Sequence, residues 1–332
     1  MIIELIIFSL INFIILFIIA KASYKLNLVD IPNKRKIHSD PTVFTGGLAI
    51  AIALAISIPL VDIKNYNLDL IFSMGILISL IGLIDDKFQL NVGGKLSLQI
   101  LPIIYLMIFK DLYLFNLGEF NNFKLELGAF GVPFTLLCIL LLINAFNYFD
   151  GMNGTLSFAT ISTFLILYFL ISDKNLLMFF NLIIVSLIIF LLFNFSLLKL
   201  PRIFLGDSGS LLIGFIVSFI LIEIANKNLV HPILLAWSIA VFVYEFLSIN
   251  LIRLKNNQKI FSPAKDHLHH LLFFKTNSIS LTNFFIILIN VLFFFTGYLC
   301  FVLISPLVSL ILFPIMFIIY LLLRIELLIL NK

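Results

Sequence analysis

Apolar stretches long enough to cross a bilayer recur along the whole chain, separated by short polar segments. A membrane-spanning helix needs about 20 apolar residues, because the hydrocarbon core is about 30 Å thick. The pattern therefore predicts an all-α polytopic membrane protein with about 11 transmembrane helices, or about 10 if the last two segments merge. The predicted ranges are 2–20, 47–61, 68–84, 96–109, 129–146, 156–172, 176–194, 211–225, 232–252, 282–304 and 307–323. Several are short, so we expect them to be tilted, broken or extended into their flanks.

Composition agrees with this class. Of the 332 residues, 62% are hydrophobic and 11% are charged, whereas a soluble domain carries about a quarter charged residues. No repeat, linker or second domain is visible, so we expect one integral membrane domain over residues 1–332. Cys138 and Cys300 each lie in an apolar run, which supports neither a disulfide framework nor a zinc site. The first apolar segment lacks a basic start and is followed by lysines, which favours a retained helix over a signal peptide.

The positions of the basic residues predict the orientation. Alternate loops contain only Lys64, Lys110, Lys124, Lys174 and Lys227, and the other lysines and arginines of the 21 lie in the remaining loops and the C-terminal tail from Arg324. Since basic loops stay in the cytoplasm, the N-terminus is predicted to lie outside and the C-terminus in the cytoplasm. The outer loop 110–128 alternates apolar and polar residues around a central pair of asparagines, which predicts a small β-hairpin.

Two adjacent carboxylates, Asp85 and Asp86, close the apolar stretch 68–84. Neighbouring like charges at the end of a membrane segment are costly unless a cation offsets their repulsion. From this stretch alone, a solvated helix end and an ion site remain equally open.

The first inner loop mixes Asp, Asn, Arg and His, including Arg35 and His38. It suits phosphate recognition, with contact to anionic lipid as the alternative.

Polar residues also mark the end of the fifth span. Asn144, Asn147 and Asp150 recur every three residues, so they share one face while the helix lasts. Amides and a carboxylate at membrane depth face protein or water, not lipid. Gly151 then permits a turn or a close approach to a ligand. Simple helix capping is the alternative.

Asp207 stands in the small-residue segment Gly206–Ser210, immediately before the eighth span. Backbone N–H groups at such a helix start attract anions. Taken alone, Asp207 reads as a helix N-cap. Beside the other carboxylates it becomes a good Mg²⁺ ligand, because Mg²⁺ takes one or two carboxylates together with substrate phosphate oxygens.

Three of the five histidines, His267, His269 and His270, lie in the longest inner loop. On a helix His267 and His270 would share a face while His269 points elsewhere, which makes a three-histidine metal site awkward. We therefore expect phosphate or nucleotide contacts, with a solvated amphipathic loop as the alternative.

In this order and spacing, the motifs resemble those of the polyprenyl-phosphate N-acetylhexosamine-1-phosphate transferases, the MraY/WecA superfamily, and the Ser262-Pro263 pair before the histidines resembles its WecA/TagO branch. The residues that carry the likeness are Asp85, Asp86, Lys95, Gln99, Asn144, Asn147, Asp150, Gly151 and Gly206–Ser210. Two positions depart from the family pattern. Asn153 stands where members often have an aspartate, and an amide cannot take up a proton at neutral pH. Glu245 stands where many members carry aspartate, and its role is open.

The resemblance implies an enzyme of a bacterial cytoplasmic membrane with its active site facing the cytoplasm. It would transfer an N-acetylhexosamine-1-phosphate, GlcNAc-1-phosphate first, from a UDP-sugar to undecaprenyl phosphate, release UMP and initiate a cell-surface glycan such as O-antigen, enterobacterial-type glycan or teichoic acid. Mg²⁺ is the implied cofactor, with Mn²⁺ as a substitute. Partners are the UDP-N-acetylamino sugar, undecaprenyl phosphate and membrane lipids but no nucleic acid, and a homodimer stays open.

The implied roles of the residues are as follows. Catalytic residues are Asp85, Asp86, Asp150 and Asp207; the metal ligands are Asp207, Asp85 and Asn147; the substrate-binding residues are Asn147, Lys95, His267, His269, His270, Arg35 and His38. Direct phosphoryl attack and an aspartyl-phosphate intermediate both remain open. Other donors, UDP-GalNAc, UDP-QuiNAc or UDP-MurNAc-pentapeptide, are the close alternative, and a cation-coupled transporter is the alternative from another class.

Overall fold

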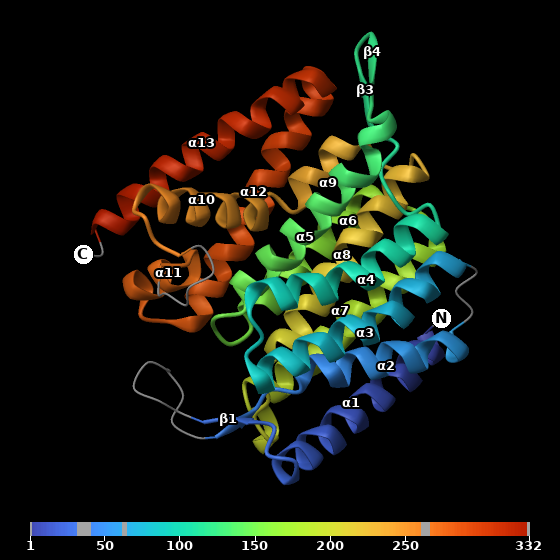
Figure 1. Cartoon of the computed structure of the whole chain (residues 1–332), viewed down its shortest axis with the longest axis vertical. Helices are drawn as coiled ribbons and strands as arrows, with labels where there is room; N and C mark the ends of the chain where they lie inside the picture. Colours follow the sequence, from blue (N-terminus) through green and yellow to red (C-terminus); the bar gives the residue numbers. More distant parts are fainter. Residues whose placement is uncertain (1, 32–40, 62–64, 260–265, 331–332) are drawn as a thin grey trace. The chain divides into compact units, whose positions relative to one another are not determined.

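The structure is a computed structural model that describes residues 2–31, 41–61, 65–259 and 266–330 (Figure 1). Arg35 and His38, predicted to bind substrate, lie outside the described residues. The chain divides into two compact units. Unit 1 comprises Met1–Lys110 and Ser172–Val217, and unit 2 comprises Asp111–Ile171 and Ser218–Lys332.

Unit 1 is a helical layer whose members pack side by side (Figure 1). It contains α1 (Ile2–Lys25), β1 (Val29–Asp30), β2 (Thr42–Val43), α2 (Gly46–Leu60), α3 (Tyr66–Phe88), α4 (Val92–Phe109), α7 (Lys174–Asn194), the 3-10 helix η2 (Leu197–Lys199) and the first part of α8 (Gly206–Asn226). Three helix starts are set locally. Asn65, Asn91 and Asp173 each accept a hydrogen bond from a backbone N–H two or three residues further on, which caps α3, α4 and α7.

Backbone pairing fixes the segment that leads into α8. β1 and β2 form an antiparallel pair, and Val43 of β2 also bridges Ile203. The N–H groups of Gly46 and Gly47 then donate to the carbonyl oxygens of Phe204 and Leu205, at 3.0 and 2.9 Å. The start of α8 is therefore held by the start of α2, although more than 150 residues separate them in the sequence.

Glycines allow neighbouring helices to reach the start of α8. A Cβ on Gly82 of α3 would overlap the backbone of Asp207 and Ser208, and one on Gly47 would overlap the backbone of Gly209. Gly206 itself has φ +71, a conformation that only glycine adopts without strain. Close packing of α2 and α3 on α8 thus depends on the absence of side chains at these positions.

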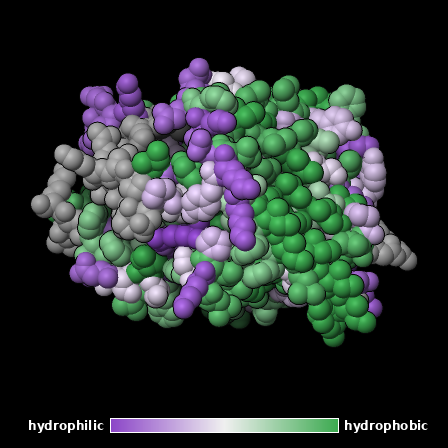
Figure 2. All heavy atoms as spheres, turned by 90° about the horizontal axis from the view of Figure 1, so that it is seen from below, coloured by the Kyte–Doolittle hydropathy of each residue, from purple (hydrophilic) through white to green (hydrophobic). Residues whose placement is uncertain are grey.

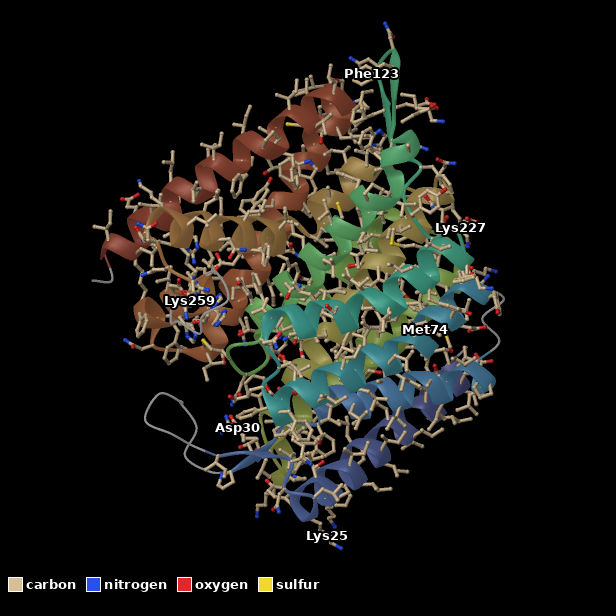
Figure 3. The ribbon with its side chains drawn as sticks, viewed as in Figure 1. Lys25, Asp30, Met74, Phe123, Lys227 and Lys259 are labelled. Carbon is tan, nitrogen blue, oxygen red and sulfur yellow. The ribbon has the colours of Figure 1, made fainter. Side chains whose placement is uncertain are left out.

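Unit 2 is built around α12, which contacts α6, α9, α10, α11 and α13. Its elements are β3 (Asn116–Phe120), β4 (Phe123–Glu126), the 3-10 helix η1 (Gly128–Phe130), α5 (Gly131–Phe149), α6 (Thr155–Leu170), the rest of α8, α9 (Pro232–Ser238), α10 (Ala240–Lys255), α11 (Leu268–Thr276), α12 (Ile279–Leu303) and α13 (Pro306–Leu330). β3 and β4 pair antiparallel, with Phe123 near the tip (Figure 3). The predicted hairpin in loop 110–128 is confirmed.

Each of the eleven predicted ranges lies mainly in helix, with ends that differ by a few residues. The ninth is two helices, α9 and α10, bent by 69° at a short break. The last prediction was wrong at its end: we expected a tail from Arg324, but α13 continues to Leu330 and Arg324 is only 1% exposed. A buried ion pair, described below, accounts for this. The short helix α11 was not predicted.

Eight of the described helices are long and apolar enough to cross a membrane, and nine if the bent pair counts as one span. α2 and α6 are apolar but have only 15 and 16 residues. Figure 2 shows a broad area of apolar side chains on the face that it draws. Large apolar side chains also remain exposed along α1 and α13, as expected where lipid covers them. The chain is thus an all-α, multi-pass membrane protein.

Candidate active site

Unit 1 contains a carboxylate cluster, formed by Asp85, Asp86, Lys95 and Asp207. The aspartate pair lies in the last turn of α3, Lys95 in the first turn of α4, and Asp207 in the first turn of α8. Lys95 Nζ lies 2.7 Å from Asp85 Oδ2 and 2.5 Å from Asp207 Oδ2. One ammonium group therefore joins two carboxylates from different helices. Their side chains are only 11% and 29% exposed, so the charges lie at a partly solvated edge.

The two adjacent aspartates do different work. Asp86 accepts hydrogen bonds from the backbone N–H groups of Asp207 and Ser208, at 3.1 and 3.4 Å. A carboxylate in this place caps α8 and complements the positive end of its dipole. Asp85 instead accepts from the N–H of Leu90, at 2.8 Å, which holds the turn between α3 and α4. Asp86 thus orients Asp207, and Asp85 shares Lys95 with it.

Gln99 lies one turn along α4 from Lys95 and is fully buried. Neither polar atom of its amide has a hydrogen-bond partner among the described residues. An unsatisfied buried amide costs about 1–3 kcal/mol. A water molecule or a substrate group at this position would remove that cost.

The donor set of the carboxylate cluster fits Mg²⁺. Asp85 and Asp207 supply hard oxygen atoms that already converge on one cation, the ammonium of Lys95. Within the described ranges, no three His, Cys, Asp or Glu side chains form a complete metal cage. An ion bound here would complete its coordination with substrate oxygens and water, the usual habit of Mg²⁺. Asn147, the third predicted ligand, belongs to unit 2 and stays a prediction.

Unit 2 contains a histidine cluster, formed by His267, His269 and His270. Ring centroids lie 5.5 Å apart for His267 and His269, 6.3 Å for His267 and His270, and 4.3 Å for His269 and His270. The expectation that His269 points away from the others was wrong. His267 precedes α11 with an extended backbone (φ −69, ψ 151), so helical spacing does not apply to its ring.

Burial lowers the pKa of two of these rings. It lowers the pKa of His269 well below 6.5, and the nearby charges of His270, His267 and Arg324 lower it further. Burial also lowers the pKa of His267, although Glu245 and Asp266 oppose the shift. His269 Nε2 and His267 Nδ1 have no hydrogen-bond partner among the described residues. A neutral imidazole offers one N–H donor, so each ring retains hydrogen-bonding capacity that no described residue uses.

The end of α5 lies against the histidine cluster. The helix stops at Phe149, and the N–H of Asp150 donates to the carbonyl oxygen of Asn147 at 3.2 Å. Any side chain at Gly151 would overlap the ring of His269. The loop that contains Asp150 therefore packs against His269, and the absence of a side chain at Gly151 makes this contact possible.

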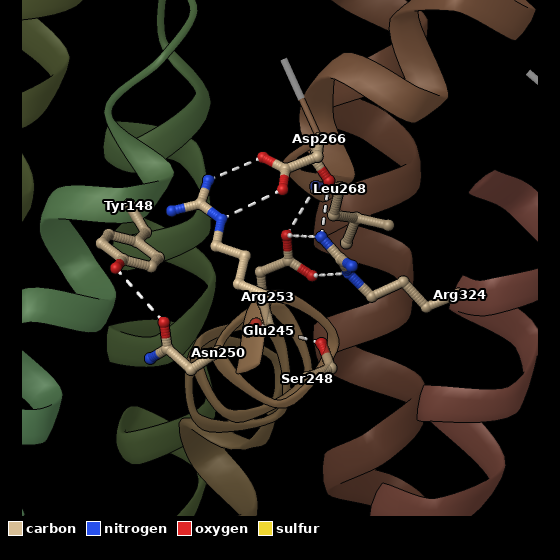
Figure 4. Close-up of polar contacts among 8 residues, drawn as sticks. All are labelled: Tyr148, Glu245, Ser248, Asn250, Arg253, Asp266, Leu268 and Arg324. Carbon is tan, nitrogen blue, oxygen red and sulfur yellow. Dashed lines mark hydrogen bonds and ion pairs between the residues drawn. The ribbon is translucent and has the colours of Figure 1, made fainter. Parts of the chain in front are cut away.

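Four residues around the histidine cluster had no predicted role: Arg253, Asp266, Tyr320 and Arg324. Arg253 of α10 binds the carboxylate of Asp266 with two hydrogen bonds, at 2.8 and 3.2 Å (Figure 4). Burial would raise the pKa of Asp266, but these bonds and the charges of Arg253, His267 and Arg324 hold it below its ordinary value. One signal was available. An arginine within an apolar helix needs a partner, and Arg324 lies in such a helix.

Unit 2 also contains an apolar cavity of about 320 Å³. Side chains of α5, α8 and α9 line it, among them Phe134, Leu221 and Leu235. None of the described site residues is among the lining residues. A cavity of this character suits a hydrocarbon chain and not a sugar nucleotide.

Comparison with known proteins identifies the family. The model of glycosyl transferase family 4 matches residues 68–225, a range that includes Asp85, Lys95, Asp150 and Asp207. The undecaprenyl-phosphate alpha-N-acetylglucosaminyl 1-phosphate transferase of Escherichia coli (strain K12) is 32% identical over 279 residues, which cover 81% of this chain and 75% of that protein. The chain belongs to glycosyl transferase family 4.

Two further relatives show how widely the likeness extends. The enzyme of the same name from Yersinia pestis is 31% identical over 276 residues, covering 81% of this chain and 76% of that protein. A probable undecaprenyl-phosphate N-acetylglucosaminyl 1-phosphate transferase of Bacillus subtilis (strain 168) is 30% identical over 264 residues, covering 76% and 72%. The family predicted from the motifs is therefore confirmed, and the roles of individual residues stay predictions.

Proposed function

We propose that this member of glycosyl transferase family 4 transfers N-acetylglucosamine-1-phosphate from UDP-GlcNAc to undecaprenyl phosphate and releases UMP. The observation that carries this proposal is the 32% identity over 279 residues to a transferase named for that reaction. The multi-pass helical fold suits an acceptor that stays in the membrane.

The carboxylate cluster is the proposed centre of the transfer. Two phosphorylated reactants repel each other, and Mg²⁺ held by Asp207 and Asp85 would supply the positive charge that offsets this repulsion. Lys95 contributes a second positive charge at the same carboxylates. Asp86 acts by fixing the start of α8 and hence Asp207. The acceptor phosphate is largely ionised near neutral pH, with a second pKa of about 6, so direct attack needs little base catalysis.

The remaining predicted residues are proposed to bind and orient the donor. His267 and His269 present buried, unpartnered ring nitrogens to which phosphate oxygens can bind. Asn147 and Asp150 lie at the end of α5 and are proposed to orient the nucleotide. Arg35 and His38 are proposed to add phosphate contacts from the first inner loop.

The proposed orientation places this chemistry at the inner leaflet of the bacterial cytoplasmic membrane. We take the eleven helical segments as spans, with the N-terminus outside, because the alternate loops that contain most of the basic residues then face the cytoplasm. A soluble UDP-sugar in the cytoplasm would then reach the site directly.

Mass spectrometry of the lipid product tests this function. Membranes containing the protein are incubated with undecaprenyl phosphate and an equal mixture of UDP-GlcNAc, UDP-GalNAc, UDP-QuiNAc and UDP-MurNAc-pentapeptide. We expect undecaprenyl diphosphate-linked GlcNAc as the main product; a different linked sugar would correct the donor. In the same assay Asp207→Asn tests the metal assignment, since undiminished Mg²⁺-dependent UMP release would rule out Asp207 as a required ligand.

A further inference from the structure

A buried polar network surrounds the backbone that carries the histidine cluster (Figure 4). Glu245 of α10 and Arg324 of α13 form its centre, and each is only 1% exposed. Arg324 Nε donates to Glu245 Oε2 at 2.9 Å, and Arg324 Nη2 lies 3.3 Å from Glu245 Oε1. Tyr320, one turn before Arg324, donates its hydroxyl to Glu245 Oε2 at 2.6 Å.

The Glu245–Arg324 pair also forms hydrogen bonds with the main chain on both sides of His267. Glu245 Oε1 accepts a hydrogen bond from the N–H of Leu268, at 2.6 Å. Arg324 Nη2 donates to the carbonyl oxygen of Asp266, at 2.5 Å. The backbone groups just before and just after His267 are thus bound to the same ion pair. Leu268 is also the first residue of α11, so the hydrogen bond to Glu245 satisfies a backbone N–H group at the start of that helix.

From these contacts we infer that Glu245 and Arg324 form a latch that positions the histidine cluster for phosphate binding. Neither residue touches substrate in this inference, so both are positioning residues. The inference rests on the proposed function for the identity of the ligand. The latch differs from a plain ion pair between α10 and α13. It requires the carboxylate on α10 and the guanidinium on α13, whereas an ion pair requires only two opposite charges.

Charge placement makes the two roles separable. A plain ion pair would survive exchange of the partners, in the double variant Glu245→Arg with Arg324→Glu. That exchange removes the acceptor for the Leu268 N–H on α10 and the donor for the Asp266 carbonyl on α13. The two hydrogen bonds to the backbone around His267 would then be absent, although the charges are balanced.

The experiment compares four variants with the wild-type protein in detergent: Arg324→Lys, Arg324→Gln, the exchanged double variant, and Glu223→Gln as a matched control. Glu223 of α8 is 3% exposed and pairs at 2.9 Å with Lys227, which follows the end of that helix. Figure 3 shows Lys227 well away from Lys259, which lies in the loop between α10 and α11. The measurements are the unfolding temperature, hydrogen exchange of peptide 266–276 without substrate, and kcat and KM for UDP-GlcNAc.

We expect Arg324→Gln to lower kcat/KM for UDP-GlcNAc at least tenfold and to speed exchange at Leu268. Arg324→Lys should fall between it and the wild type, because one ammonium cannot reproduce the guanidinium fork. The exchanged variant should have a higher unfolding temperature than Arg324→Gln, but its kcat/KM should stay low and its exchange at Leu268 fast. Glu223→Gln should keep the wild-type kcat/KM and the wild-type slow exchange. If Arg324→Gln does not fold, Arg324→Lys against Glu223→Gln decides.

Two results overturn the latch. One is recovery of kcat/KM to within twofold of wild type in the exchanged variant, and the other is wild-type exchange at residues 266–276 in Arg324→Lys. A wild-type protein that releases no UMP would instead overturn the proposed function, while the substrate-free exchange measurement would still support or overturn the latch.

Discussion

Lys95 offers the most direct test of the carboxylate cluster. Its ammonium lies 2.7 Å from Asp85 and 2.5 Å from Asp207, so Lys95→Met removes two charge-assisted contacts while keeping the length and apolar stem of the side chain. It also leaves two carboxylates facing each other without a counter-charge. We therefore expect a large loss of activity in a protein that still folds.

The size of the loss follows from these contacts. A hydrogen bond to a charged group contributes about 1.5–3 kcal/mol, and two are removed. Asp207 is 29% exposed, so water partly replaces the ammonium, and we take about 3 kcal/mol as the net effect. Since about 1.4 kcal/mol changes a rate tenfold, kcat/KM should fall about 100-fold. The half-saturating Mg²⁺ concentration should also fall, because Lys95 no longer competes for the two carboxylates.

The assay is UMP release from UDP-GlcNAc in the presence of undecaprenyl phosphate, with Mg²⁺ titrated. Lys87→Met is the matched control, since Lys87 is an exposed lysine in the same turn of α3 as the aspartates and lies over the Phe88 ring. It should stay within twofold of wild type. If Lys95→Met keeps more than half of the wild-type kcat/KM with an unchanged Mg²⁺ response, the cluster is not the catalytic centre.

Three further outcomes are expected. Asp86→Ala should lower the free energy of unfolding by about 1–2 kcal/mol through loss of the α8 cap, measured by chemical denaturation, and Asp86→Asn should lose less. Gly82→Ala should destabilise the protein by about 1–3 kcal/mol in the same assay, because its methyl group would overlap the backbone at Asp207. Burial holds the pKa of His267 and His269 below 6.5 in the folded protein. As pH falls below 6.5, the unfolded chain therefore takes up protons that the folded protein does not, and stability should decrease. Thermal unfolding between pH 8 and 5 would show this slope, and a slope unchanged in His269→Gln would contradict it.

Hydropathy alone located the long apolar helices of this protein, but not the short helix α11. Lipid cannot hydrogen-bond the backbone, so each apolar span must satisfy its own N–H and C=O groups and therefore forms a helix. That constraint is local, which explains why each of the eleven ranges lies mainly in helix. The alternation of apolar and polar residues in loop 110–128 is also a local signal, and it predicts the observed hairpin. The order and spacing of the polar motifs likewise identified the family.

Only the tertiary structure assigned partners to the polar residues. Asp86 caps a helix that begins 120 residues later, and Glu245 pairs with Arg324, 79 residues away. Hydropathy describes the medium around each residue and contains no information on which distant side chain it meets. The Arg324 side chain therefore looked like the start of a charged tail, although it lies buried against Glu245, Tyr320 and the main chain at Asp266. Burial makes such pairing obligatory, because a lone charge in the protein interior costs several kcal/mol.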